Sequence, residues 1–125
     1  MDVALQIRGG PLACGRCKLA ETPLARLRGL LGRSRLPPGE GVLLRPASAI
    51  HTCFMRFPVD AVFLDEQGLV LRMVPRLPPW HAAMQPGARS VLELAAGECG
   101  RVGIRPGVRI EVQPRGDSAP PALFA

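Results

Sequence analysis

The stretch VDAVFLDEQGLVLRMV, residues 59–74, decides the fold. It contains two short runs rich in apolar and β-branched residues, 59–65 and 69–74, and this composition is typical of β-strands. Between the runs, Asp65 begins a short connection in which Gly68 can take the left-handed conformation of a hairpin loop. The stretch therefore predicts two antiparallel strands joined by a tight turn.

Outward from this hairpin, most of the chain has the same β-rich character. Residues 3–7 alternate apolar and polar side chains, which is the period of a half-buried strand. Residues 75–88 are rich in proline and are expected to form an extended loop, whereas residues 98–104 suit one short helical turn. The further strands expected are residues 13–20, 41–45, 50–55, 90–94 and 108–112.

One longer helix is expected, over residues 22–32. Thr22 is suited to cap its N-terminus, Pro23 to occupy its first position, and Gly32 to end it. Many short strands with one such helix predict a mainly β (α+β) fold. The expected architecture is a curled antiparallel sheet or a small β-barrel, with the helix covering one opening.

The length of 125 residues and the hydrophobic fraction of 47% suit one domain with a sizeable core. We expect this domain to span residues 1–113, and the polar, Pro-rich residues 114–125 to form a flexible C-terminal tail. Residues 1–8 lack the pattern of a secretory signal, and no apolar run approaches the roughly 20 residues that span a bilayer. These features predict a cytoplasmic protein with no membrane partner.

The net charge is +6, and every basic residue except Lys18 is arginine. Guanidinium groups bind phosphate and carboxylate in a bidentate manner, so an anionic partner suits this composition. The arginines are spread along the whole chain, however, and only clustering would indicate nucleic-acid binding. Because the sequence has no Gly-x-Gly-x-x-Gly or phosphate-binding loop, we expect no cofactor.

Cys14 and Cys17 have the spacing of half of a structural zinc site, for which His51 and Cys53 are candidates for the other half. A strand would hold His51 and Cys53 only two residues apart, unlike the usual second Cys-x-x-Cys or helical His pair. The expected helix begins too late to lower the pKa of either thiol for redox chemistry. We therefore favour free thiols over a metal site or a disulfide framework.

Two carboxylates stand in otherwise apolar strands, Asp60 and Glu93. A carboxylate in that position must be paired, metal-bound or functional. For Asp60, the plain alternative to a function is a structural ion pair with Arg28 or Arg56. Arg28 lies beside the apolar face of the expected helix and would itself need a carboxylate partner.

The 51–60 segment adds further candidates, because strand alternation would place His51, Cys53 and Met55 on one face. We expect a pocket or groove where the helix that carries Arg28 meets this segment. The candidate ligand-binding residues are Arg28, His51, Met55, Arg56, Asp60 and Glu93.

Three motifs occur together in an order typical of one family: residues 26–33 (RLRGLLGR), 51–65 (HTCFMRFPVDAVFLD) and 91–97 (VLELAAG). The chain therefore resembles the domain-of-unknown-function 192 family of bacteria and archaea over about residues 18–112. The resemblance implies a compact, mainly β domain with a short early helix, and it implies no reaction or ligand. It marks Arg28, Met55, Asp60 and Glu93, together with Gly29, Leu30, Asp65 and Gly97 as positions of the structural motif.

The chain departs from the family pattern in two respects, the residues that follow the methionine and the export signal or lipid anchor that many members carry and that is not expected here. Many members carry Lys-Asn-Thr after the methionine, where this chain has residues 56–58 (RFP). The Cys-x-x-Cys pair is not part of the pattern, which argues further against zinc.

Three functions remain open from the sequence. The leading hypothesis is a binding or interaction module for an anionic small molecule or an acidic peptide. The second is an enzyme that uses Asp60 or Glu93 as acid or base, with His51 assisting. The third is nucleic-acid binding through the arginine-rich helix, for which the few aromatic residues provide little stacking surface.

Overall fold

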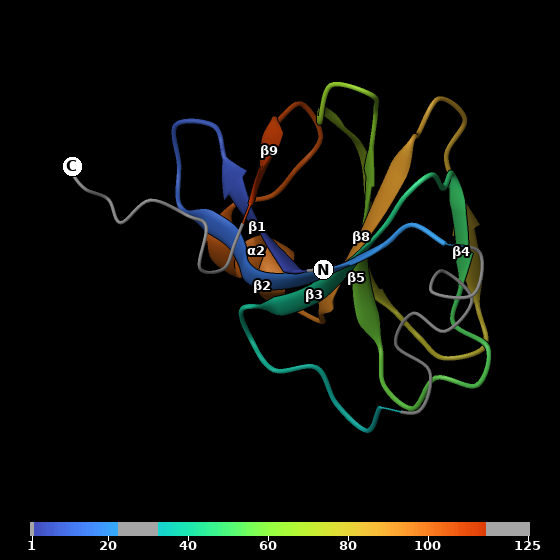
Figure 1. The fold of residues 1–125 in the computed structure, drawn as a ribbon. Helices are drawn as coiled ribbons and strands as arrows, with labels where there is room; N and C mark the ends of the chain where they lie inside the picture. The colour runs from blue at the N-terminus through green and yellow to red at the C-terminus, as the bar shows by residue number, and fades with distance from the viewer. Residues whose placement is uncertain (1, 23–32, 115–125) are drawn as a thin grey trace.

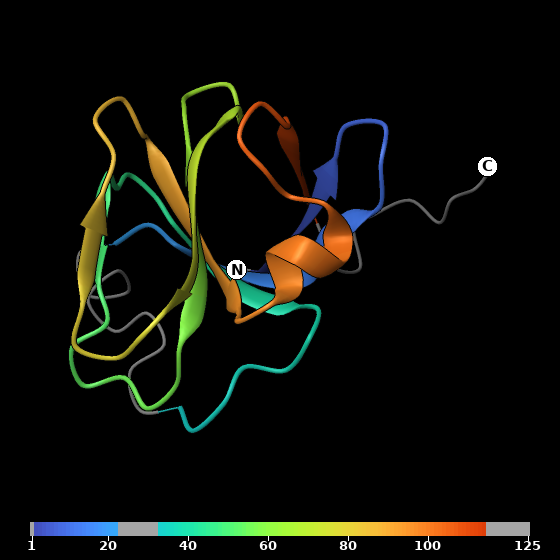
Figure 2. The ribbon, with the colours of Figure 1, turned by 180° about the vertical axis from the view of Figure 1, so that it is seen from behind.

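The computed structural model describes residues 2–22 and 33–114; residues 1, 23–32 and 115–125 lie outside the described part, and with them nearly all of the expected 22–32 helix and the expected tail. Figures 1 and 2 show a mainly β fold, as the sequence predicts. Within the described ranges, no helix has the length and apolarity needed to cross a membrane. The elements are β1 (Asp2–Ile7), β2 (Leu12–Ala20), β3 (Glu40–Leu44), β4 (Ala49–His51), β5 (Val59–Leu64), β6 (Val70–Leu77), β7 (Ala82–Met84), β8 (Ser90–Ala95), α2 (Glu98–Val102) and β9 (Ile110–Pro114).

Seven strands form one sheet in the order β6-β5-β8-β3-β2-β1-β9, while β4 and β7 form a separate ribbon. The sheet curls into a half-barrel (Figure 1), and its two edges approach each other where Leu69 and Arg109 form a single β-bridge. The predicted curled antiparallel sheet is confirmed with one exception. The strands β2 and β3 run parallel, because the segment between them returns the chain to the end of the sheet where β2 began.

The 59–74 stretch forms the predicted hairpin, with β5 and β6 antiparallel. Asp65 caps its turn, since Oδ1 accepts hydrogen bonds from the N–H groups of Gln67 (2.8 Å) and Leu69 (2.9 Å). Gly68 has a φ of 84°, and a Cβ at this position would lie 2.2 Å from the carbonyl oxygen of Ile110. Both the conformation and the close approach of the turn to β9 therefore require glycine.

Side-chain alternation gives the central strands two buried faces. The α2-side core, which includes Leu92 and Val102, lies between the sheet and α2. The ribbon-side core, which includes Met55, Phe63 and Val91, lies between the sheet and the β4–β7 ribbon. Neighbouring residues of β8 thus belong to different cores, so a shift of one residue in register would exchange the two sets.

Two local expectations were wrong. The strand expected over residues 50–55 ends at His51, and the chain then turns through Phe54 at a φ of 67°. The loop expected over residues 75–88 contains the end of β6 and all of β7. Because β6 is an edge strand of the sheet, it tolerates Pro75. The short helical turn expected within 98–104 is present as α2.

Replacement of Gly68 by alanine should destabilise the domain more than its backbone conformation alone requires. Gly39 is the matched control, because its φ of 83° is nearly the same but a Cβ there would meet nothing within 4 Å. We expect Gly39→Ala to lose about 1–2 kcal/mol of unfolding free energy, and Gly68→Ala to lose at least about 1 kcal/mol more from the contact with Ile110. Urea unfolding measures both losses, and equal losses would contradict the close approach.

Candidate functional site

Asp60 lies in β5 with its side chain 1% exposed, on the α2 side of the sheet. Its Oδ1 accepts a hydrogen bond from the N–H of Arg76 (2.9 Å), and its Oδ2 accepts from the N–H groups of Gly97 (3.1 Å) and Cys99 (3.0 Å). Three backbone donors thus stabilise the carboxylate. Their positions tie β5 to β6 and to the first residues of α2, which is a structural role.

Of the two ion-pair partners that the sequence indicated for Asp60, only Arg56 lies among the described residues, and it does not pair with Asp60. Among the described residues the partners of Asp60 are backbone amides and the Cys99 thiol, and no ion pair joins it to the exposed Arg56. The other expected partner, Arg28, lies outside the described residues, as do Gly29 and Leu30. The expected structural positions Asp65 and Gly97 form the turn cap of the β5–β6 hairpin and the residue that precedes α2.

Asp60 and Glu93 leave the sheet on opposite faces. In the β5–β8 ladder Asp60 lies opposite Leu94, and Glu93 lies opposite Ala61. Directly opposed residues share a face, and neighbours along a strand do not. The two carboxylates therefore cannot act together on one substrate, and the enzyme hypothesis loses its acid–base pair.

The remaining described candidates are also divided between surfaces. Met55 is buried in the ribbon-side core, which is the face that Glu93 shares with Ala61. His51 is exposed at the end of β4, where its neighbour Ile50 packs inward and His51 points outward. The candidate residues therefore do not form one site. Met55 and Glu93 share the ribbon side of the sheet, while His51, Arg56 and Asp60 lie elsewhere.

Glu93 is a buried carboxyl group whose pKa is strongly raised. Its side chain is only 4% exposed, and within the described part of the chain its carboxyl has no hydrogen bond or ion pair. Burial raises the pKa of Glu93 from about 4.5 to about 7. A carboxyl in this state keeps its proton near neutral pH and can ionise in response to a small change of environment.

Cys14 and Cys17 are free, buried thiols of β2. The hydrogen bond with Cys14 and burial both raise the pKa of Cys17, so this thiol stays protonated. Over residues 2–22 and 33–114, no three His, Cys, Asp or Glu side chains gather into a metal-binding group.

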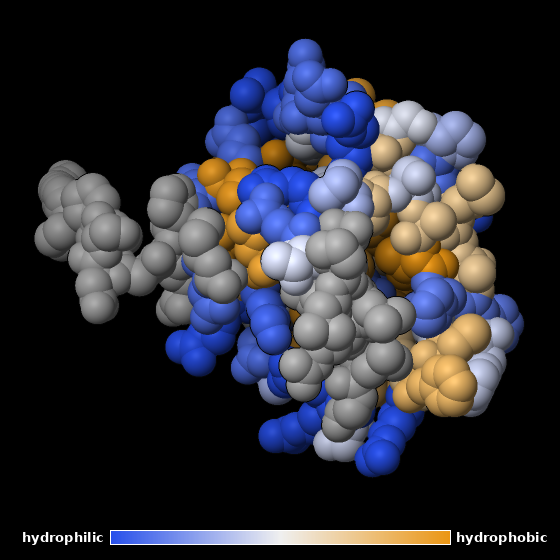
Figure 3. Space-filling model, turned by 45° about the vertical axis from the view of Figure 1, so that its right-hand side comes forward, coloured by the Kyte–Doolittle hydropathy of each residue, from blue (hydrophilic) through white to orange (hydrophobic). Residues whose placement is uncertain are grey.

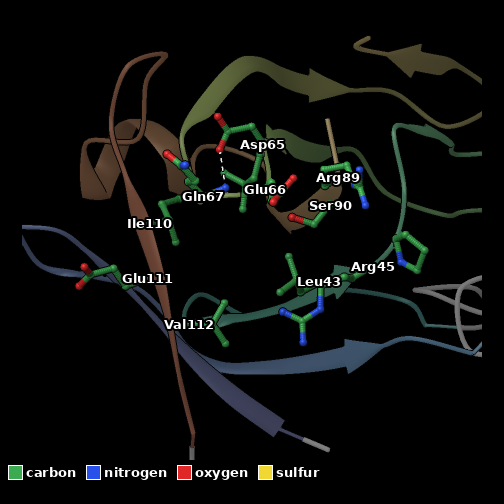
Figure 4. Close-up of a pocket in the computed structure, with 13 residues that line it drawn as sticks. Leu43, Arg45, Asp65, Glu66, Gln67, Arg89, Ser90, Ile110, Glu111 and Val112 are labelled. Carbon is green, nitrogen blue, oxygen red and sulfur yellow. Dashed lines mark hydrogen bonds between the residues drawn. The ribbon is translucent and has the colours of Figure 1, made fainter. Parts of the chain in front are cut away.

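A cleft of about 400 Å³ opens at one end of the half-barrel (Figure 4). Leu43, Leu64 and Ile110 are among its apolar lining residues, and charged side chains surround them. The charged lining consists of Arg45, Arg89, Asp65, Glu66 and Glu111, which is two positive groups against three negative ones. This cleft therefore carries a slight negative charge and is a poor site for an anion.

A second cleft, of about 510 Å³, lies between the β1–β2 turn and the loop that joins α2 to β9. Three arginines line it, Arg8, Arg105 and Arg109, and no carboxylate does; we call it the arginine cleft. The N–H of Arg8 donates to the carbonyl oxygen of Arg109 at 2.9 Å, so these two residues are opposed across β1 and β9. Their guanidinium groups have separate partners, because Arg8 pairs with Glu111 and Arg109 Nη1 donates to the carbonyl oxygen of Gln67 at 2.9 Å.

No local sequence pattern indicates the arginine cleft. Arg8 is about one hundred residues from Arg105 and Arg109, and only the β1–β9 pairing brings them together. The counterion of Arg8 is Glu111, at 3.0 Å, in a pair whose side chains are 64% and 43% exposed. An exposed pair of this kind contributes little stability, so Arg8 can turn to a ligand at small cost.

Glu93→Gln should change how stability depends on pH. The folded chain holds the Glu93 proton up to about pH 7, so this group stabilises the fold below its unfolded pKa of about 4.5. That contribution is lost as the pH rises through the interval between the two pKa values, by about 3 kcal/mol at 1.36 kcal/mol per pKa unit.

The difference in unfolding free energy between Glu93→Gln and the parent protein should therefore shift by about 3 kcal/mol in favour of the variant from pH 4 to pH 8. Urea unfolding at the two pH values measures this shift. Glu66→Gln, at an exposed position, is the control and should show a much smaller change. Parallel pH profiles for Glu93→Gln and the parent would show that Glu93 titrates normally.

The comparisons with known proteins agree with this fold. No curated protein matches the chain. A solved protein of Sinorhizobium meliloti 1021, proposed to be a transcription regulator, has a TM-score of 0.81 and 23% identity over 90% of this chain and 94% of its own. A protein of unknown function from Novosphingobium aromaticivorans DSM 12444 has a TM-score of 0.77 and 24% identity, over 89% and 84%.

At these identities the two structures show a shared fold only. A family model, DUF192, described as "Uncharacterized ACR", matches residues 4–112, which is most of the described domain. The chain therefore belongs to the DUF192 family.

Proposed function

We propose that this domain is a binding module for small anionic molecules and that the arginine cleft is its binding site. The observation that carries the proposal is the lining of that cleft: three arginines and no carboxylate. A guanidinium forms paired hydrogen bonds with phosphate or carboxylate oxygens, in a geometry that a single positive charge does not provide. The chemistry of the ligand is therefore that of a phosphate or a polycarboxylate.

The size of the cleft favours a small molecule. Its volume of about 510 Å³ lies within the roughly 300–1,000 Å³ of ordinary small-ligand pockets. It lies between a tight turn and a loop, and both of its sides belong to the same domain. A small anion fits that shape better than an acidic peptide, which would need an extended groove.

The two clefts differ in the charge of the residues that line them. The cleft of Figure 4 holds both signs, and its Arg45 already pairs with Glu21 at 3.0 Å. In the arginine cleft, Arg105 is exposed and has no ion pair with any described residue. A ligand there gains its contacts without breaking a buried interaction.

The proposal moves the site away from the segment that the sequence favoured but keeps the ligand class. An enzyme that relies on Asp60 and Glu93 finds no support, since these groups lie on opposite faces of the sheet. The arginine-rich helix proposed for nucleic acid lies mostly outside the described residues, and Arg33 just beyond it pairs with Glu40 at 3.2 Å.

Thermal shift and titration calorimetry with inorganic phosphate, pyrophosphate and citrate test the proposal. At least one of these anions should bind saturably and raise the Tm. Arg105→Ala should weaken that binding about tenfold, the effect of losing one charged hydrogen-bonding group. The control Arg89→Ala, which removes the same charge from the rim of the other cleft, should change the Kd less than twofold.

Two results would overturn the proposal. One is the absence of saturable binding by any of the three anions. The other is an equal loss of affinity in Arg105→Ala and Arg89→Ala, because that result would show that net charge rather than the cleft attracts the anion.

A further inference from the structure

Two aromatic side chains project from the loops at one end of the β4–β7 ribbon. Phe54 is 70% exposed and Trp80 is 62% exposed. Their ring centroids lie 4.7 Å apart with a tilt of 58°, so the rings form one continuous surface. We call Phe54 and Trp80 the aromatic ridge.

The backbone holds both rings in unusual positions. Phe54 and Trp80 each have a φ of 67°, a conformation that bulky residues rarely adopt. Asparagine or glycine would satisfy these turns with less strain, so the aromatic side chains are not explained by the fold alone. Strained residues of this kind point to a function.

Thr52 fixes the two loops to each other. Its hydroxyl is fully buried, donates to the carbonyl oxygen of Pro78 and accepts from the N–H of His81 at 2.9 Å. Its backbone carbonyl accepts hydrogen bonds from the N–H groups of Trp80 (3.0 Å) and Met55 (3.1 Å). The aromatic ridge is therefore preorganised, with little freedom left to lose on binding.

Along the chain, neither residues 51–59, around Phe54, nor residues 77–84, around Trp80, include an acidic residue. Met84, at the end of β7 that is farther from Trp80, is 59% exposed, and Figure 3 shows apolar side chains interspersed with polar ones on the part of the surface that this view brings forward. Arg56 lies two residues after Phe54, and Arg72 donates to the carbonyl oxygen of Met84 at 2.6 Å.

We propose that the aromatic ridge and its arginines dock this domain onto an anionic lipid surface. The ridge projects from the molecule, so its partner must be a surface into which the two rings can insert. The interfacial layer of a bilayer is deformable and is such a surface. Indole and phenyl rings are favoured in that layer, and arginines near it are attracted to anionic headgroups. The attachment is peripheral and reversible, so it replaces the expectation of no membrane partner drawn from the sequence, and it is independent of the arginine cleft.

Trp80 is the only tryptophan of the chain, so its fluorescence reports directly on the ridge. Vesicles of equal parts phosphatidylglycerol and phosphatidylcholine should shift its emission to shorter wavelength in a saturable way. Vesicles of phosphatidylcholine alone, or the mixed vesicles in 0.5 M salt, should bind at least about fivefold more weakly, because the electrostatic attraction is absent or screened.

Asparagine variants separate the rings from the backbone, because asparagine tolerates a positive φ. Phe54→Asn, read by Trp80 emission, and Trp80→Asn, read by vesicle sedimentation, should each fold and each weaken binding about tenfold. Arg56→Gln should weaken it about fivefold. The control Leu12→Asn removes an apolar side chain that is 49% exposed elsewhere and should have no effect.

Arg105→Ala should also leave vesicle binding unchanged, so failure of the anion-binding proposal and failure of this one are distinguishable. Absence of any shift with the anionic vesicles would overturn the lipid proposal. Folded Asn variants that bind vesicles as well as the parent protein would overturn it too, as would equal binding to both lipid compositions. In those cases the ridge would belong to a protein interface instead.

Discussion

The carboxylate of Asp60 holds the parts of this domain in their relative positions. A charged group that is 1% exposed needs donors on every side, and here the backbone of β6 and of the start of α2 provides them. If the carboxylate were lost, three amide groups would remain buried without acceptors, at about 1–3 kcal/mol each. Asp60 therefore fixes where β6 bends and where α2 begins, and with α2 the position of one core.

Local signals explain what the sequence predicted correctly. The hairpin at 59–74 depends on Asp65 and Gly68, which act within their own turn. The short helix α2 begins directly after Gly97, which has a positive φ. The turn after His51 was missed because it depends on Thr52, whose hydrogen-bonding partners lie 26 and 29 residues further along. The parallel β2–β3 pair was missed for the same reason, since no pattern within either strand encodes its neighbour.

The candidate site was predicted in part. Sequence reasoning identified Asp60 and Glu93 as carboxylates in apolar strands, and both are buried. It could not assign their faces, because these depend on the register between β5 and β8, in which the two residues are offset by one. For Arg8 and Arg109, by contrast, no such signal exists, as single exposed arginines look alike along a chain.

The pairing of β1 with β9 also sets an order of events during synthesis. Residues 2–7 are made about one hundred residues before residues 110–114, so one edge of their strand finds its partner only late. Until then the hydrogen-bonding groups of that edge stay available to other chains. The nascent polypeptide thus has a period of exposure that lasts while the residues between β1 and β9 are made, and the pairing with β9 ends it.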